Sequence, residues 1–477
     1  MKGQPMFQGR VSATLRRVAP VFAGFAIVVA VAAIAGWNGA AAAGLSGRED
    51  AASGIGAWHD APPVDAAGTG TGSRAPQTQQ QLAGSDPHGA YTLTTSSCAA
   101  CHRSHTAPAD TLLTESAREG ALCFSCHDGT GANSNVQAQY TDVNVPANNA
   151  ATSSFYSHPA TSPSSHISGL VDEFAGVLNR HSACADCHNP HTMNSTLAVG
   201  TSSGWRASGA LAGSAGVSAS PAYTWTDPIV YEDELCYKCH SGYTTLLSYS
   251  KESYKKTDKL VEFDTANASY HPIEAAGKNT TSQLAASLAG GSRWNTFTTG
   301  STVRCVNCHG DYRAASPAAN ARLAPHTSRY RGLLIANYRD RDLKSSSQAY
   351  AAADFALCYL CHSQAPFSTT SEDPRADTNF RYHGKHLRGI SNEGGGGLDI
   401  DTLGAGQGNA ICAECHYRTH STKLAPWAGN QDYARGVNFA PNVRPIVGEA
   451  APLWSPVTQT CTLTCHGEKH DPESYAP

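Results

Sequence analysis

The chain of 477 residues is poor in several residue types from which globular cores are usually built. Charged residues make up 15% of it, phenylalanine occurs 12 times and methionine three times, whereas glycine occurs 44 times. Such a chain would struggle to close a large core from its side chains alone. We therefore expect little regular secondary structure, and much of the buried apolar surface must come from another source.

Basic residues are scarce beyond the N-terminal segment. The first 43 residues contain four basic and no acidic residues, with an apolar run at 18–37 and three alanines at 41–43. This order is typical of a secretory signal peptide, so we expect export; an uncleaved membrane anchor is the alternative. Without this segment 30 Lys and Arg face 38 Asp and Glu, a formal charge of −8. We expect no nucleic-acid partner, because phosphate binding needs a basic face. Membrane contact is expected only if the segment stays uncleaved.

No cysteine is left over when the sixteen cysteines are grouped by spacing. They form eight pairs, each followed at once by a histidine, and the last pair has one extra residue in its spacer. Disulfides or zinc sites would explain the cysteine pairs but not the histidine after every pair. The spacing is that of covalent haem c attachment, in which two thiols reach the two vinyl groups of a porphyrin and the histidine lies under the iron. The pairs are Cys98/Cys101, Cys123/Cys126, Cys184/Cys187, Cys236/Cys239, Cys305/Cys308, Cys358/Cys361, Cys412/Cys415 and Cys461/Cys465, and the expected proximal ligands are His102, His127, His188, His240, His309, His362, His416 and His466.

The motifs repeat in two alternating types. The first type has small or polar residues between its cysteines, and the second has a leucine before and an aromatic residue after its first cysteine in three of four copies. The repeat predicts four di-haem modules, at 86–167, 168–273, 274–383 and 384–477, after a flexible segment at 44–85. The expected fold is mostly irregular, with short helices at the motifs, built around a chain of eight haems. Short strands are expected near 222–226 and 229–231.

The second axial ligand of each iron decides between an electron carrier and an enzyme. Methionine cannot fill this place generally, since Met193 is the only methionine after the signal segment, whereas thirteen histidines lie outside the motifs. Eight are needed, and His59 and His166 are the weaker choices. The sequence does not assign the others to particular irons. These distal candidates are His88, His105, His158, His181, His191, His271, His326, His383, His386, His420 and His470.

Irons with two histidines have no open position for substrate, so electron transfer at low potential is the expected function. The variant Cys-x-x-Cys-Lys, which would suggest a catalytic haem, does not occur in the sequence. Two alternatives stay open. One is a multihaem reductase for nitrite, hydroxylamine or a sulfur oxyanion, and the other is a polymerising subunit of a conductive filament.

Three segments resemble the doubled CXXCH family of multihaem c-type cytochromes. They are Pro87-His-Gly-Ala-Tyr91, Cys98-Ala-Ala-Cys101-His102 with His105, and Leu122-Cys-Phe-Ser-Cys126-His127; Cys184-Ala-Asp-Cys187-His188-Asn-Pro-His191 is similar to a second copy. The resemblance implies a periplasmic or extracellular electron carrier whose partners are other redox proteins or further copies of itself; the terminal acceptor stays open. It favours His88, His105, His158, His191 and His271 as distal ligands. The long spacer at Cys461 and the absence of a histidine shortly after His309 depart from the family pattern.

Overall fold

A computed structural model describes most of the chain beyond the N-terminal segment. The chain divides into two units, Met1–Gly70 and Thr71–Pro477, and all described residues belong to the second. The predicted signal peptide, the whole 44–85 segment, His59, His166 and His181 lie outside the described residues. None of the described helices is both long and apolar enough to cross a membrane. The described residues are 88, 96–108, 112–115, 119–132, 134–141, 156–158, 160, 182–193, 205–219, 224–243, 258–315, 324–344, 348, 350–368, 378–390, 399–403, 408–424, 427 and 433–475.

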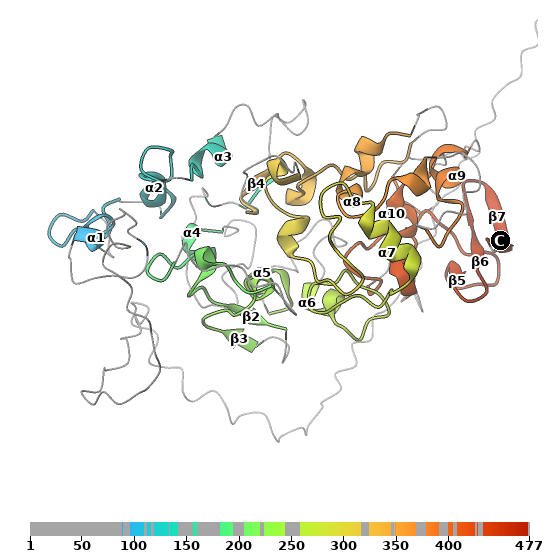
Figure 1. Ribbon diagram of the computed structural model, residues 1–477, viewed down its shortest axis with the longest axis horizontal. Helices are drawn as coiled ribbons and strands as arrows, with labels where there is room; N and C mark the ends of the chain where they lie inside the picture. The colour runs from blue at the N-terminus through green and yellow to red at the C-terminus, as the bar shows by residue number, and fades with distance from the viewer. Residues whose placement is uncertain are drawn as a thin grey trace, which may run out of the picture. The chain divides into compact units, whose positions relative to one another are not determined.

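Irregular backbone dominates the second unit, interrupted by short helices (Figure 1). The longest helix described has nine residues. The α-helices are α1 Ser96–Ala99, α2 Glu119–Phe124, α3 Gln137–Thr141, α4 Cys184–Cys187, α5 Glu232–His240, α6 Lys259–Phe263, α7 Ser282–Ala289, α8 Ala356–Tyr359, α9 His383–Arg388 and α10 Cys412–Cys415. Short 3₁₀ turns are η3 Gly209–Leu211, η5 Cys305–Asn307, η6 Tyr312–Ala315, η7 Arg331–Leu333, η8 Ala352–Phe355, η9 Ala365–Phe367 and η10 Ala434–Gly436. The expectation of a mostly irregular chain with short helices is confirmed.

Seven of the eight motifs lie on a helical turn, and the eighth does not. Helices α1, α2, α4, α5, α8 and α10 and the turn η5 each carry the first cysteine of a motif, as the sequence led us to expect. The eighth motif instead lies in strand β6, Thr460–Cys465. Its sequence alternates threonine with cysteine and leucine, and this two-residue period with β-branched residues favours a strand.

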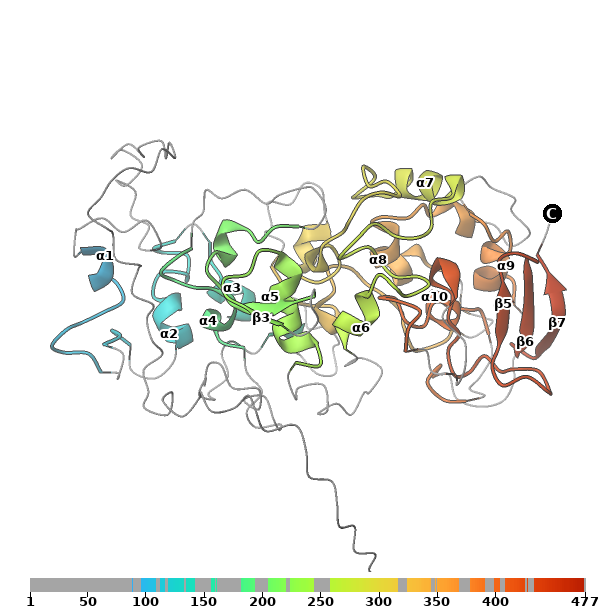
Figure 2. The same ribbon diagram turned by 90° about the horizontal axis from the view of Figure 1, so that it is seen from below.

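The strands form three small antiparallel sheets. Strand β1 (Tyr156–Ser157) pairs with β4 (Thr327–Ser328), and β2 (Gly216–Ser218) pairs with β3 (Thr224–Thr226). The strand expected near 222–226 is therefore confirmed, but its partner is β2; residues 229–231 form no strand, and Tyr231 makes only an isolated bridge to Arg206. The third sheet joins β5 (Leu453–Ser455), β6 and β7 (Glu468–Ser474), which stand side by side in Figure 2.

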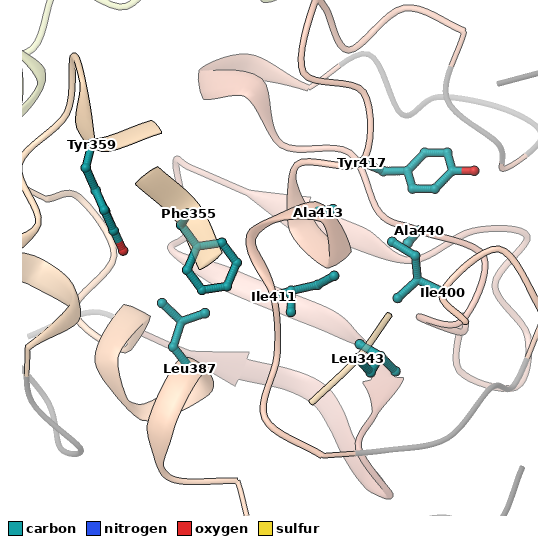
Figure 3. Close-up of a cluster of buried hydrophobic side chains, with 9 residues drawn as sticks. All are labelled: Leu343, Phe355, Tyr359, Leu387, Ile400, Ile411, Ala413, Tyr417 and Ala440. Atoms are coloured by element: carbon teal, nitrogen blue, oxygen red, sulfur yellow. The ribbon is translucent and has the colours of Figure 1, made fainter. Parts of the chain in front are cut away.

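Buried apolar side chains gather in several small clusters. Figure 3 shows the largest among the described residues, in which α8, α9 and α10 contribute Tyr359, Leu387 and Ala413, the turn η8 contributes Phe355, and the segments before, between and after these helices contribute the rest. A second cluster joins Phe439, Val443 and Leu463 of β6, with Cys415, Cys461 and Cys465 at its margin. These clusters fix the C-terminal motifs relative to one another.

Candidate functional site

In three motifs of the first type, the polar side chain just before the second cysteine accepts a backbone N–H at the start of the same turn. The Asp186 carboxylate accepts the Ala183 N–H at 2.7 Å, Asn307 Oδ1 accepts the Arg304 N–H at 2.7 Å, and Glu414 Oε2 accepts the Ile411 N–H at 3.2 Å. These bonds satisfy backbone donors at the start of the turn. Residues three apart on such a turn have Cβ atoms about 5–6 Å apart, so the two thiols point to one region. The polar position is visible in the sequence, but its capping role was missed.

The histidine that follows the cysteines is oriented through its Nδ1 atom. A ring that donates Nδ1–H to a backbone carbonyl presents Nε2 as an unprotonated ligand atom. Four proximal histidines do so, and a fifth bonds a hydroxyl. The bonds are His127 to Ser134 O at 3.2 Å, His188 to Ala210 O, His309 to Gly332 O and His416 to Gly436 O, each at 2.8 Å, and His362 with Ser287 Oγ at 3.3 Å.

Five proximal histidines each face a second histidine at nearly the same distance. An iron held by Nε2 of both rings at about 2.0 Å sets the ring centroids about 6 Å apart, because each centroid lies about 1 Å behind its Nε2. The observed separations are 6.1 Å for His102 with His191, His127 with His88, His188 with His326 and His309 with His420, and 6.3 Å for His240 with His158. The chain therefore leaves room for one iron between the rings of each pair.

The distal candidates are themselves joined in three equivalent pairs, which we call histidine junctions: His88 with His191, His158 with His326, and His271 with His420. In each junction the Nδ1–H of the first histidine donates to the carbonyl of the residue just before the second. The acceptors are Pro190 O at 3.2 Å, Pro325 O at 2.6 Å and Thr419 O. In the second and third junctions the first histidine also donates its backbone N–H to the carbonyl of the second, at 3.0 and 2.9 Å. The junction thus orients one prospective ligand and holds it beside the backbone of a second.

The pattern of the histidine junctions also indicates which distal candidate belongs to the sixth motif. In the first two junctions, the first histidine faces a second-type motif and the second faces the first-type motif just before it. In the third, His420 faces His309, so the same rule assigns His271 to His362. Burial and the neighbouring His271 lower the pKa of His362 to about 4. For the seventh motif, burial and the neighbouring His416 lower the pKa of His383 to about 3.

Burial keeps most of these imidazoles neutral, which is the form that binds a metal. Removal from water lowers the pKa of His240 to about 3 and of His309 and His326 to about 4. The neighbouring histidines act in the same direction. His466 is the exception: burial opposes its charge, but the Glu414 carboxylate raises the pKa of His466 above its ordinary value.

Two distal candidates are oriented by side chains that the sequence did not single out. His326 Nδ1 bonds Gln139 Oε1 at 3.2 Å, and His420 Nδ1 bonds Glu262 Oε2 at 3.0 Å. Glu262 is buried on α6, and its pKa lies at about 2 because the bond from His420 and the charge of Lys259 outweigh the cost of burial. In the sequence, Glu262 is marked only as a carboxylate between Val261 and Phe263, and nothing marks Gln139.

Three further predicted ligands, His105, His386 and His470, lie in other surroundings. His105 is exposed, and none of the described proximal histidines forms a ring pair with it. His386 donates Nδ1–H to Tyr382 O at 2.8 Å, and His470 Nε2 lies 3.9 Å from Cys465 Sγ. Among the described residues no three His, Cys, Asp or Glu side chains gather around a position for a bare metal ion.

The structure describes the sixteen cysteines of all eight motifs, and none of these forms a disulfide. Cys239 is one of the sixteen predicted haem-binding thiols. It lies half-buried near the end of α5, three residues after Cys236 and directly before His240. This place on the turn agrees with attachment to haem, but position alone does not show a thioether bond. The predicted role of Cys239 therefore stays a prediction.

Neighbouring motifs also meet through their cysteines. The Cys305 thiol is hydrogen-bonded to the Cys236 thiol, and together with burial this contact raises the pKa of Cys236. The thiols of Cys358 and Cys412 meet in the same way. Helices α2 and α4, which carry Cys123 and Cys184, pack against each other. The second-type motif of each module is therefore next to the first-type motif of the following one.

The eighth motif lacks the helical turn that the other seven motifs share. Cys461 and Cys465 lie four residues apart on a strand, a separation of about 13 Å when fully extended. His466 accepts the Gly408 N–H at Nδ1 and donates Nε2–H to Glu414 Oε2, both at 3.2 Å. With both ring nitrogens bonded, no ligand atom faces a position for iron.

Comparison with known proteins finds a match that covers the first two motifs. Residues 91–132 match the family model described as the doubled CXXCH motif. No curated protein and no solved structure that was compared matches the chain. Motifs of this kind bind haem c covalently. The first two motifs are thus similar to the doubled CXXCH motif, which is typical of multihaem c-type cytochromes.

Proposed function

We propose that the protein is an exported c-type cytochrome that carries electrons along a chain of bis-histidine haems in periplasmic or extracellular respiration. The observation that carries the proposal is the set of five imidazole pairs with centroids 6.1–6.3 Å apart. This spacing suits an iron bound on both sides. Haem c, when bound, supplies a one-electron Fe(III)/Fe(II) couple.

The residues of the chain fix the ligands and restrict their movement. Each histidine junction ties one distal imidazole to the backbone just before a second distal histidine, so that the first ring cannot rotate without losing a hydrogen bond. An iron held on both faces has no position open to substrate, which favours an electron carrier over a reductase. Two imidazole ligands also favour a lower potential than a methionine ligand would.

The haems would follow one another in chain order. The histidine junctions bring together motifs one with two, three with four and five with six. The cysteine contacts bring together four with five and six with seven, and the packing of α2 on α4 joins two with three. With haem bound at these motifs, electrons would pass between consecutive sites, and the exchange partners at the ends would be other redox proteins or further copies of the chain.

Spectroscopy and potentiometry of the purified holoprotein test this function. We expect only low-spin haem signals in the resting protein and reduction at negative potentials. High-spin haem together with turnover of nitrite, hydroxylamine or a sulfur oxyanion would favour a reductase. A titration that lies wholly at high positive potential would contradict bis-histidine ligation.

A further inference from the structure

The eighth motif differs from the others first in the spacing of its thiols. On a helical turn the two cysteines of a motif are near neighbours, but Cys461 and Cys465 belong to one strand that is paired on both sides. Cys461 lies opposite Trp454 of β5 and Glu473 of β7, while Cys465 lies opposite Glu468. Moving the thiols together would break this pairing, so two thioether bonds to one porphyrin do not fit the sheet.

The backbone of His466 also differs from that of a proximal histidine. His466 and Gly467 form the two-residue turn between β6 and β7, with φ of 49° and 76°. Two positive φ values define the tight turn that suits the twist of a hairpin. His188 and His416, by contrast, follow their helices with φ of −128° and −126°.

The ring of His466 is bonded on both sides in a closed environment. Its side chain is 3% exposed and that of Glu414 is 2% exposed. Glu414 stands between the cysteines of the seventh motif, where Oε2 accepts from both Ile411 N–H and His466 Nε2–H, and Oε1 accepts from Asn442 Nδ2 at 2.6 Å. The carboxylate therefore has a partner on each oxygen.

We infer that the eighth motif holds no haem and that His466 is a positioning residue for the seventh. Through Glu414 it fixes the turn that carries Cys412, Cys415 and His416, while the hairpin of β6 and β7 closes over the cluster formed by Phe439, Val443 and Leu463. The chain then carries seven haems. The inference rests on the proposed function, since it presupposes haem at the first seven motifs.

Intact mass and thiol mapping of the holoprotein test the haem count. We expect seven additions of about 616 Da each, and after unfolding, iodoacetamide labels only Cys461 and Cys465. Eight additions with both cysteines protected overturn this inference and leave the proposed function standing. Haem missing from several of the first seven motifs instead counts against the proposed function.

A pair of double variants provides a matched control. Cys461→Ser with Cys465→Ser should leave the haem count at seven, whereas Cys412→Ser with Cys415→Ser should lower it by one. Loss of one haem in the first double variant overturns the inference. The second variant shows that a lost haem is detected when an occupied motif is removed.

Substitution of His466 separates positioning from ligation. His466→Ala should keep seven haems but shift the electron paramagnetic resonance of one low-spin haem, because Glu414 loses a donor. His466→Gln, which keeps an N–H donor, should restore the wild-type signal. If either variant loses a haem relative to the wild type, or converts one to high spin, His466 is an iron ligand and the inference fails.

Discussion

A histidine becomes a defined ligand when one of its two ring nitrogens is already bonded. In this chain the Nδ1 atoms of proximal and distal histidines bond mainly to backbone carbonyls, as His188 does to Ala210 and His158 to Pro325. The tautomer and the ring orientation are then set before a metal binds. His105 lacks such an arrangement among the described residues, although its place in the sequence is equivalent to that of His191.

His191 and His105 form a matched pair for testing distal ligation. Each follows a proximal histidine by three residues, but only His191 faces one, His102, at 6.1 Å. We expect His191→Ala to convert one haem equivalent, at the first motif, from low to high spin. His105→Ala should leave the spectrum unchanged. Optical and electron paramagnetic resonance spectra measure both, and a spin change in the His105 variant alone would reverse the assignment.

We expect Glu262 to tune the reduction potential of one haem through His420. A carboxylate that accepts the Nδ1–H makes the imidazole a stronger donor to Fe(III) and so lowers the reduction potential. Glu262→Gln should raise the potential of one haem by on the order of 60 mV, equivalent to about 1.4 kcal/mol of hydrogen-bond energy. Gln139→Ala, at the corresponding position against His326, should act on a different haem. A potentiometric titration in which the Glu262 variant matches the wild type would rule this role out.

At the scale of the element, helical turns at the motifs could be predicted from the sequence, whereas their surroundings could not. The Cys-x-x-Cys spacing itself suits one turn, and seven motifs have it. The alternation of threonine with cysteine and leucine at 460–465 was the available signal that the eighth would be a strand. The partner of β3 was not predictable, because short strands of three residues carry too little pattern to specify a register.

The loop after α7 supports the sixth motif by close backbone packing. A Cβ atom on Gly291 would lie 2.6 Å from the carbonyl oxygen of Cys361, so a side chain there displaces the motif. We expect Gly291→Ala to destabilise the holoprotein by about 1–3 kcal/mol. Gly300→Ala is the control, since its Cβ would meet only Thr298 Oγ1, at 3.9 Å. Guanidinium unfolding followed by haem absorbance measures the difference, and equal midpoints for both variants would contradict the packing argument.

At the scale of the whole molecule, the motifs depend on one another across long stretches of chain. His191 faces a histidine 89 positions earlier, and His420 faces one 111 positions earlier. The buried clusters between them are small, the largest having nine buried residues. The haems must therefore supply much of the apolar surface that holds the second unit together.

Folding should accordingly depend on haem attachment. We expect the full chain, produced without haem attachment, to lack a cooperative unfolding transition and to be cleaved rapidly by protease. The holoprotein, under the same conditions, should unfold cooperatively and resist cleavage. Circular dichroism and limited proteolysis compare the two. A haem-free chain with native-like resistance would show that side chains alone suffice.

The sequence by itself determined the chemistry that the motifs indicate: paired thiols with adjacent histidines at the spacing of one helical turn are typical of covalent haem c, and the scarcity of methionine favours histidine as the second ligand. Only the tertiary structure decided which histidine faces which. His88 faces His127 of the second motif, and His191 faces His102 of the first. A hydrogen bond from His88 to Pro190 O holds together these two segments, which lie about 100 residues apart in the sequence. The structure also decided that His466 faces Glu414. The eighth motif forms strand β6, so His466 begins the turn after a strand and does not follow a helical turn as the other proximal histidines do. The spacing within a motif determines how its two thiols are placed, whereas long-range packing determines which histidines face one another.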